Sequence, residues 1–452
     1  MTSSLIRKYN VPGPRYTSYP TVPFWKEEVN LESWKAQVKN TFNLTNKEKG
    51  ISLYIHLPYC ESLCTYCGCT TRITINHAVE KPYIDMVLKE WKLYLDLFEE
   101  VPEITEIHLG GGTPTFFSPE NLVRLIEGIK QTVIVRDDVE FGFEGHPNNT
   151  TEEHLKILYD QRFRRVSFGI QDFDPMVQRI INRMQSYEQV KIVVDQARSI
   201  GYESINFDLI YGLPLQTQDS IKDTFNKVQT LRPDRIAFYS YAHVPWVKPG
   251  QRMFTEKDLP NNEEKRKLYE LGKQLLTDIG YCEIGMDHFS LPEDALYQAV
   301  NNGNMHRNFM GYTTNHSMLS VGLGVSAIGD SWNGYGQNIK KVELYKKEVE
   351  NGQFPIVKTH ILTKQEAFVR KHITNLMCRF ETSWDLATQE AETFQDVEKR
   401  LQGMIEDGLI VHTPGQIKVT ETGRPFVRNA CMALDVYLWK ESDKSQKFSL
   451  TV

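Results

Sequence analysis

The chain of 452 residues lacks the features of a membrane protein, a secreted protein or a nucleic-acid-binding protein. No apolar run approaches the length of about 18 residues that a membrane span needs, and the first ten residues contain no apolar core of a secretory signal. The net charge of −6 gives no electrostatic reason for a nucleic acid or an anionic membrane to bind. We therefore expect a cytoplasmic protein with no nucleic-acid partner and no membrane partner.

A disulfide framework is also missing. Cys282, Cys378 and Cys431 are widely scattered, which fits a reducing compartment. The other four of the seven cysteines crowd into residues 60–69, directly after the apolar segment 51–57, which is typical of a strand. A packed core does not need four neighbouring thiols, whereas a metal or an iron–sulfur cluster does.

The spacing of these thiols favours an iron–sulfur cluster. Cys60, Cys64 and Cys67 stand at a C-x₃-C-x₂-C spacing, and Cys69 follows two residues later. A structural zinc site closes with four ligands, often as two separated pairs, and the second pair is missing here. Three thiolates can bind three corners of a cubane cluster and leave the fourth iron open to another ligand. Zinc and redox-active thiols are the alternatives.

Apolar strand segments alternate with amphipathic helical segments over much of the chain. Strands separated by helices form βαβ units with a parallel sheet. Six units predict an α/β fold, an incomplete TIM-like (β/α)6 barrel, with a doubly wound sheet as the alternative. The expected strands are 51–57, 104–109, 138–144, 164–169, 204–211 and 234–241, with helices at 78–98 and 118–133 among those between them.

Polar and glycine residues follow these strands at their C-terminal ends, where parallel α/β folds place their chemistry. The cysteine loop follows the first strand in the same way. The six strands therefore predict one rim that carries the cysteines, Gly110 to Gly112, Glu144, Gln171, Asp208 and His243.

The chain divides into three expected parts. Residues 1–50 form an N-terminal arm with a short helical pattern near 31–42, and residues 51–355 form the barrel domain. Residues 356–452 form a mostly helical C-terminal domain that resembles a winged helix, with helices at 364–379 and 394–408 and a hairpin at 408–420. Because no basic recognition stripe is present, we expect this domain to cover the open rim of the barrel and not to bind DNA.

Eight motifs carry a resemblance that extends from residue 8 into the C-terminal region: 8–21 (KYNVPGPRYTSYPT), 64–69 (CTYCGC), 110–115 (GGGTPT), 171–173 (QDF), 208–214 (DLIYGLP), 241–243 (YAH), 285–289 (GMDHF) and 306–309 (HRNF). The cysteine spacing is similar to that of the radical S-adenosylmethionine (SAM) superfamily. The full set resembles the oxygen-independent coproporphyrinogen III dehydrogenase (oxidase) family. The arm motif is the specific part, because sister families generally lack it.

The resemblance implies a cofactor set and its ligands. Cys60, Cys64 and Cys67 would bind a [4Fe–4S] cluster, Cys69 would not, and SAM would chelate the open iron. Because SAM then carries the radical, no side chain is expected to carry it. After Glu144 the family often has Val-Asp-Pro, whereas this chain has Gly145-His146-Pro147. The family contacts to SAM correspond here to Tyr54, Tyr66, Gly111, Gly112, Thr113, Glu144, Gln171, Arg183, Asp208, Ala242 and Ile328.

The resemblance also implies the reaction and the partners. Two propionates of coproporphyrinogen III would become vinyl groups, giving protoporphyrinogen IX for haem biosynthesis. The partners would be this tetrapyrrole, an electron donor and an electron acceptor, and the chain would be a monomer. We expect Arg15, Arg164 and Arg165 to be candidates for binding propionates. The alternatives are a haem-binding chaperone, or another radical SAM enzyme that acts on tetrapyrroles; the arm and the Cys67-Gly68-Cys69 segment favour the dehydrogenase.

Overall fold

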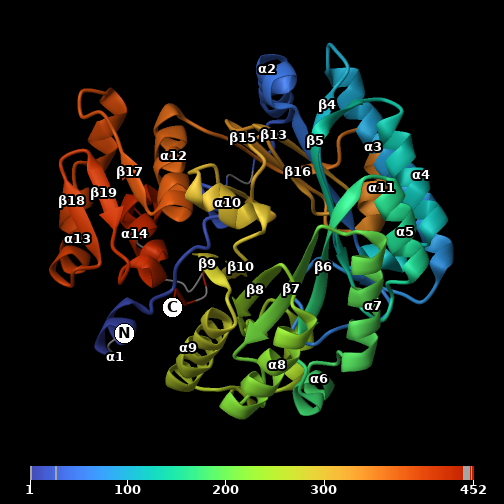
Figure 1. The fold of residues 1–452 in the computed structure, drawn as a ribbon. Coiled ribbons are helices and arrows are strands. Elements are labelled where there is room, and N and C mark those ends of the chain that lie inside the picture. The colour runs from blue at the N-terminus through green and yellow to red at the C-terminus, as the bar shows by residue number, and fades with distance from the viewer. Residues whose placement is uncertain (1–2, 26–27, 441–447, 449, 452) are drawn as a thin grey trace.

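The computed structural model describes residues 3–25, 28–440, 448 and 450–451, so small parts of the expected arm and C-terminal domain lie outside it. Its central feature is a run of six parallel strands that are neighbours in chain order, as the barrel prediction requires (Figure 1). A doubly wound sheet would instead reverse its strand order at a switch point. The strands are β1 (Ile51–Leu57), β4 (Glu103–Gly111), β5 (Ile134–Gly145), β6 (Phe163–Gln171), β7 (Ser204–Tyr211) and β8 (Arg235–Ser240).

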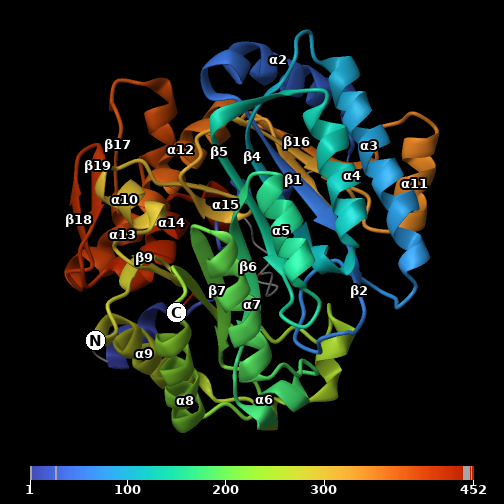
Figure 2. The same ribbon diagram turned by 45° about the vertical axis from the view of Figure 1, so that its right-hand side comes forward.

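Helices follow the strands and cover the outer face of the sheet (Figure 2). Helix α4 (Pro119–Lys130) begins as predicted, since the Ser118 hydroxyl accepts a hydrogen bond from Asn121 N at 3.4 Å. The other covering helices are α3 (Glu80–Leu97), α5 (Glu152–Asp160), α6 (Pro175–Ile180), α7 (Tyr187–Ile200), α8 (Gln218–Leu231) and α9 (Asn262–Asp278). Within the described residues, every helix is either too short or too polar to span a membrane.

The sheet extends on both sides of these six strands, which the sequence pattern did not predict. The order of its twelve strands is β16-β15-β14-β13-β1-β4-β5-β6-β7-β8-β10-β9. Strand β13 pairs with the free edge of β1 in parallel, and the other additions pair antiparallel. The added strands are β13 (Leu319–Leu323), β14 (Ile328–Asp330), β15 (Gly334–Asn338), β16 (Ile356–Ile361), β10 (His288–Ser290) and β9 (Cys282–Gly285).

Helix α2 (Leu31–Lys49) of the arm is longer than its helical pattern suggested and packs on this extension. Trp34 and Phe42 on α2 are fully buried in the barrel core. Strand β16 lies beyond residue 355 but belongs to the central sheet. The sheet therefore includes segments from both sides of the expected domain boundary.

The C-terminal region has its own small core, with the predicted helices and hairpin in place. Its elements are α12 (Lys364–Arg379), α13 (Val397–Glu406), α14 (Val427–Leu434) and a three-stranded sheet of β17 (Glu381–Ser383), β19 (Gln416–Val419) and β18 (Ile410–Thr413). The arm contributes Tyr9, Tyr16 and Tyr19 to this core. Figure 1 shows the arm, in blue, lying between the C-terminal region and the barrel.

Candidate functional site

The cysteine loop lies over the C-terminal ends of the barrel strands. After β1 the chain forms β2 (Tyr59–Cys60), which pairs with β3 (Arg72–Ile73) and so closes the loop. Thr65 fastens the loop to the end of α6, through a backbone hydrogen bond to Ile181 O and a hydroxyl hydrogen bond to Ile180 O, both of 3.0 Å. These contacts fix the loop without using any cysteine side chain.

A cavity of about 720 Å³ lies beneath this loop. Cys60, Cys64 and Cys67 border it, and so does Cys69. The cavity also brings together most of the residues for which the family resemblance implies contact with SAM: Tyr66, Gly111, Gly112, Thr113, Glu144, Gln171, Arg183 and Asp208.

Each of the three spaced cysteine sulfurs has a hydrogen-bond donor nearby. The Thr113 hydroxyl lies 3.3 Å from Cys60 Sγ, and Arg183 Nη1 lies 3.5 Å from Cys64 Sγ. The backbone N–H of Cys69 points to Cys67 Sγ at 3.4 Å. Soft sulfur ligands with donors directed at them fit an iron–sulfur cluster, whose potential such hydrogen bonds adjust.

The ionisation of these thiols differs. The Cys69 thiol, acting against burial, lowers the pKa of Cys67 to about 6, whereas burial raises the pKa of Cys60 to about 11. All four thiols border the same cavity. Among the described residues, no group of three or more His, Cys, Asp or Glu side chains is placed to hold a metal ion.

A glycine turn after β4 brings backbone close to the cysteine loop. Gly111 has a φ of +115° and donates its N–H to Glu144 Oε2 at 3.2 Å. Gly112 donates to Leu57 O at 2.8 Å, and a Cβ atom on Gly112 would lie 2.6 Å from the backbone carbon of Pro58. The turn therefore requires glycine at both positions, and its open backbone faces the cavity.

Glu144 and Asp208 are two carboxyl groups with opposite pKa shifts. Burial acts to raise the pKa of Glu144, but the His108 ring and the Gly111 N–H outweigh it and hold that pKa below its usual value. Burial, reinforced by the charge of Glu144, raises the pKa of Asp208 to about 7. Near neutral pH, Glu144 is thus a hydrogen-bond acceptor, whereas Asp208 is present in both protonation states.

His146, at the position of the departure from the family, also borders this cavity. Its Nδ1 accepts a hydrogen bond from Asn148 N at 3.1 Å, which leaves the proton of a neutral ring on Nε2. Burial and the charge of Arg183 lower the pKa of His146 to about 3, so the ring is neutral. Arg183 itself is held by Gly169 O, at 2.6 Å from Nη2.

A second cavity of about 500 Å³ adjoins the first. Gly68, Cys69, Gly111 and Glu144 border both cavities. Tyr54 and Ile328, two further residues implied by the resemblance, lie in its wall. The rest of the wall includes residues that the sequence did not single out for this purpose: Asn308 at the end of β11 (His306–Asn308), Phe309 and Met310 between β11 and β12 (Gly311–Thr313), and Ser320 and Ser326.

Ala242 lies outside the walls of both cavities. It is exposed, and its carbonyl accepts a hydrogen bond of 3.2 Å from Gln251 Nε2. The same amide donates to Tyr66 O at 3.0 Å. Ala242 therefore lies in a loop that supports the cysteine segment.

The structure contradicts the expectation that Arg164 and Arg165 bind propionates at the rim. Both lie at the beginning of β6, at the opposite end of the parallel strands from the cysteines. Arg165 forms an ion pair with Glu140, and the Arg164 guanidinium lies 3.7 Å from the centre of the Tyr159 ring. The predicted strand 164–169 begins at these two residues, so the rule that the site lies at the C-terminal ends of the strands already excluded them from the rim.

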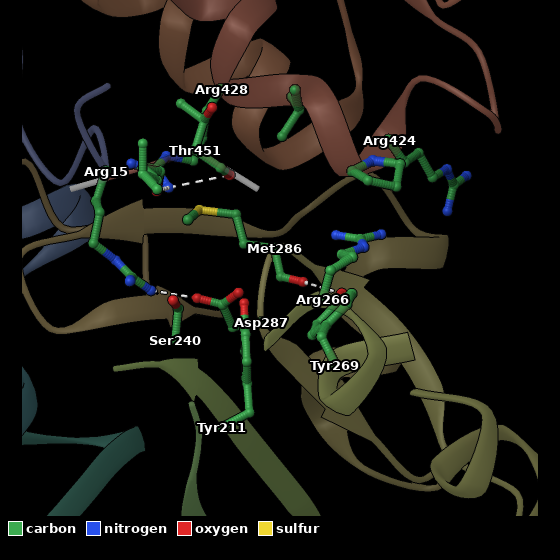
Figure 3. Close-up of a pocket in the computed structure, with 13 residues that line it drawn as sticks. Arg15, Tyr211, Ser240, Arg266, Tyr269, Met286, Asp287, Arg424, Arg428 and Thr451 are labelled. Carbon is green, nitrogen blue, oxygen red and sulfur yellow. Dashed lines mark hydrogen bonds and ion pairs between the residues drawn. The ribbon is translucent and has the colours of Figure 1, made fainter. Parts of the chain in front are cut away.

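Arg15 occupies a different position, where the arm meets the barrel and the C-terminal region (Figure 3). Its side chain forms an ion pair with Asp287, and its guanidinium lies 5.6 Å from the centre of the Tyr239 ring. Tyr239 borders the cysteine cavity. The Arg15 side chain thus packs against a residue of the cavity wall without itself lining the cavity.

The arm also contacts the second cavity. Trp25 stacks on Tyr335 with ring centres 4.9 Å apart and meets Phe309 edge-on at 6.2 Å. The Tyr16 hydroxyl donates to Asp435 at 3.0 Å, which joins the arm to the C-terminal region. The arm is therefore packed on both the cavity wall and the region that adjoins it.

Comparison with known proteins adds to this geometry. Residues 54–228 match the model of the radical SAM superfamily. The oxygen-independent coproporphyrinogen III oxidase of Helicobacter pylori strain J99 is 38% identical over 95% of each chain. The enzyme of the same name from Escherichia coli K12 is 36% identical over 99% of this chain and 98% of its own. A solved structure of coproporphyrinogen III oxidase from Escherichia coli, described as a radical SAM enzyme, superposes with a TM-score of 0.90 at 34% identity, covering 97% of this chain and 99% of that chain.

Proposed function

This chain belongs to the oxygen-independent coproporphyrinogen III oxidases, a family of radical SAM enzymes, and from that premise we propose which residues carry the reaction. The reaction converts coproporphyrinogen III to protoporphyrinogen IX in haem biosynthesis. Each of two propionates loses one hydrogen atom, one electron and CO₂ and becomes a vinyl group. The observation that carries the assignment is similarity over the full length, combined with three spaced thiols around one cavity.

The cofactors are a [4Fe–4S] cluster and SAM. When bound, they supply the radical that removes a hydrogen atom from the propionate β-carbon. Cys60, Cys64 and Cys67 hold the cluster, and Cys69 is not a ligand. This division is supported by the donors on Thr113, Arg183 and the Cys69 backbone, because they stabilise negative charge on Cys60, Cys64 and Cys67 respectively.

The remaining cavity residues position SAM and shield the reaction. Glu144 accepts hydrogen bonds from ribose hydroxyls or from the methionine amino group, and the Gly111–Gly112 turn lets the ligand approach the backbone. Asp208 donates or accepts according to its protonation state. The arm and the C-terminal region exclude water from the two cavities, as radical chemistry requires.

The partners beyond the tetrapyrrole are part of the same proposal. The reaction would need a one-electron donor for the cluster that Cys60, Cys64 and Cys67 would hold, and an acceptor for the electron that each decarboxylation releases. We assign the chain to the cytoplasm, which fits seven free cysteines without a disulfide framework, and we expect it to act as a monomer.

The test is anaerobic reconstitution with iron and sulfide, followed by incubation with SAM, a reductant and coproporphyrinogen III. We expect protoporphyrinogen IX together with release of 5′-deoxyadenosine. Cleavage of SAM without vinyl products, or stoichiometric haem binding without turnover, would contradict the assignment.

The cysteine variants test the ligand set separately. Cys67→Ser should fail to retain the cluster iron on reconstitution, because one corner loses its thiolate. Cys69→Ser is the matched control, two residues away in the same loop, and should bind as much iron as the wild-type chain. Iron loss from both variants to the same extent would refute the division of the four thiols.

A further inference from the structure

Arg307 is a buried arginine whose charge has no carboxylate partner among the described residues. It lies on β11 and is only 8% exposed. Its Nε and Nη1 atoms are buried without a hydrogen-bond partner. Its Nη2 lies 3.5 Å from Arg15 O, and its guanidinium lies 4.5 Å from the centre of the Tyr312 ring. These two contacts leave most of its donors unsatisfied.

The other buried arginines of the described residues are fully engaged. Arg370 forms two hydrogen bonds with Asp330, of 3.0 and 2.6 Å, and Arg235 binds Asp294 at 2.7 Å. Arg428 donates to backbone carbonyls, including Pro14 O at 2.9 Å. A buried, unpaired charge is unfavourable in a folded protein unless a ligand compensates it. Among the described residues Arg428 also has no carboxylate partner, but all three of its nitrogens donate to backbone carbonyls, whereas two of the three nitrogens of Arg307 have no partner.

The neighbours of Arg307 do not supply the missing negative charge. Asp287 is already paired with Arg15, as the dashed line in Figure 3 shows. His288 lies next to this group, edge-on to Tyr312 at 5.1 Å and to Tyr239 at 5.6 Å, and its Nδ1 is also buried without a partner. Arg307 and Arg15 both act, with burial, to keep His288 neutral by lowering its pKa to about 3. The group of Arg15, Asp287, His288 and Arg307, called the arginine group below, therefore has an excess of positive charge.

The arginine group lies directly behind the walls of the two cavities. Tyr239, against which His288 packs, borders the cysteine cavity. Asn308, Phe309 and Met310, which follow Arg307 in the chain, border the second cavity. Arg307 itself borders neither cavity in this structure, so contact with a ligand there requires its side chain to move from its place behind the wall.

We propose that Arg307 binds a propionate carboxylate of the tetrapyrrole, which rests on the function proposed above. The substrate has four carboxylates. Among the residues that correspond to the family contacts with SAM, Arg183 is the one cation. A planar guanidinium binds a carboxylate through two parallel hydrogen bonds. Either edge of the guanidinium pairs Nη2 with Nε or with Nη1; in Arg307 those last two atoms are unused among the described residues, and Nη2 makes only the 3.5 Å contact with Arg15 O.

The test uses the full chain and coproporphyrin III, the oxidised, air-stable form of the substrate, as a fluorescent probe. We expect Arg307→Met to bind the probe at least 10-fold more weakly than the wild-type chain, and Arg307→Lys to fall between them. Arg124→Met removes the same charge from the outer face of α4, where Arg124 pairs with Asp85, and should bind as the wild-type chain does. The tetramethyl ester of the probe, which lacks the carboxylates, should bind equally to the wild-type chain and to Arg307→Met.

Stability separates a binding role from a structural one. Because the charge of Arg307 is unpaired, Arg307→Met without ligand should melt at the wild-type temperature or above it. Probe binding by Arg307→Met within twofold of wild type, or an equal loss for acid and ester, would overturn the proposal. If Arg307→Met does not fold, Arg307→Lys decides, with wild-type affinity counting against the proposal and weaker binding supporting it. Failure of the wild-type chain to bind the probe or form vinyl products would instead overturn the proposed function.

Discussion

Glu90 on α3 offers a sharp test of how buried charge affects this fold. The side chain is fully buried and accepts hydrogen bonds from Gly324 N at 2.7 Å, Asn338 Nδ2 at 2.6 Å and the Tyr345 hydroxyl at 2.7 Å. These bonds tie α3 to the turn between β13 and β14, to β15 and to the helix that carries Tyr345, and Ser326 in that turn borders the second cavity. Burial nevertheless raises the pKa of Glu90 from 4.5 to about 7, because the three donors do not fully replace water.

The sign of the pH effect follows from this shift. A carboxyl group with a raised pKa in the folded state holds its proton more tightly when folded, so its contribution to stability is present below pH 4.5 and is lost as the pH rises through about 7. A shift of roughly 2.5 units at about 1.4 kcal/mol per unit amounts to about 3 kcal/mol. The substitution Glu90→Gln mimics the protonated form and removes this titration. We therefore expect the free energy of unfolding of Glu90→Gln, relative to that of the wild-type chain, to increase by about 2–3 kcal/mol between pH 5 and pH 8.

Thermal unfolding of the cofactor-free chain measures this gain. An unfolding entropy of about 2 cal/mol/K per residue gives roughly 1 kcal/mol/K for 452 residues, so the difference in Tm should change by about 3 °C between the two pH values. Glu350→Gln removes an exposed carboxyl group from α11 (Val342–Glu350), and its Tm difference from wild type should stay constant. A Tm difference for Glu90→Gln that is also independent of pH would refute the argument that burial outweighs the three hydrogen bonds.

Two further predictions concern the site and its base. Gly112→Ala should reduce SAM affinity at least 10-fold by equilibrium binding, because its Cβ would lie 2.6 Å from the Pro58 backbone. Gly403→Ala on α13, where a Cβ would meet nothing closer than 3.6 Å, is the control and should bind SAM normally. Equal affinities of the two variants would show that the turn tolerates a side chain. Arg165→Met should lower the free energy of unfolding by about 3–5 kcal/mol, because it leaves Glu140 without its nearest cation. The KM for the tetrapyrrole should stay unchanged. A raised KM in a stable variant would show that Arg165 contacts the substrate.

Local pattern was sufficient for the six barrel strands and for several helices. Most of these strands are largely buried, so they appear in the sequence as short apolar runs, and β7 was located at its observed bounds of 204–211. The helix over Pro119–Lys130 was marked by its own Ser118 cap, and α12 also begins and ends where its pattern does. Each of these signals lies within the element itself.

The sheet extension was missed because its strands carry no such signal. Strand β15 reads Gly-Tyr-Gly-Gln-Asn and is nevertheless fully buried, since α2 packs on it and β14 and β16 flank it. A Cβ atom on Gly336 would lie 2.5 Å from the Trp34 indole nitrogen, so glycine here serves contact with a helix from the distant arm. Such a requirement is visible only when both segments are placed.

By itself, the sequence determined the chemistry that this protein can perform. The spacing of Cys60, Cys64 and Cys67, the glycine run after the second barrel strand and the carboxyl groups at strand ends specify ligand types, and those depend on residue identity and short-range spacing. Only the tertiary structure decided which charges are compensated. Arg165 is paired at the base of the barrel and Arg307 is unpaired beside the cavities, because an ion pair depends on the distance between residues that are far apart in the chain.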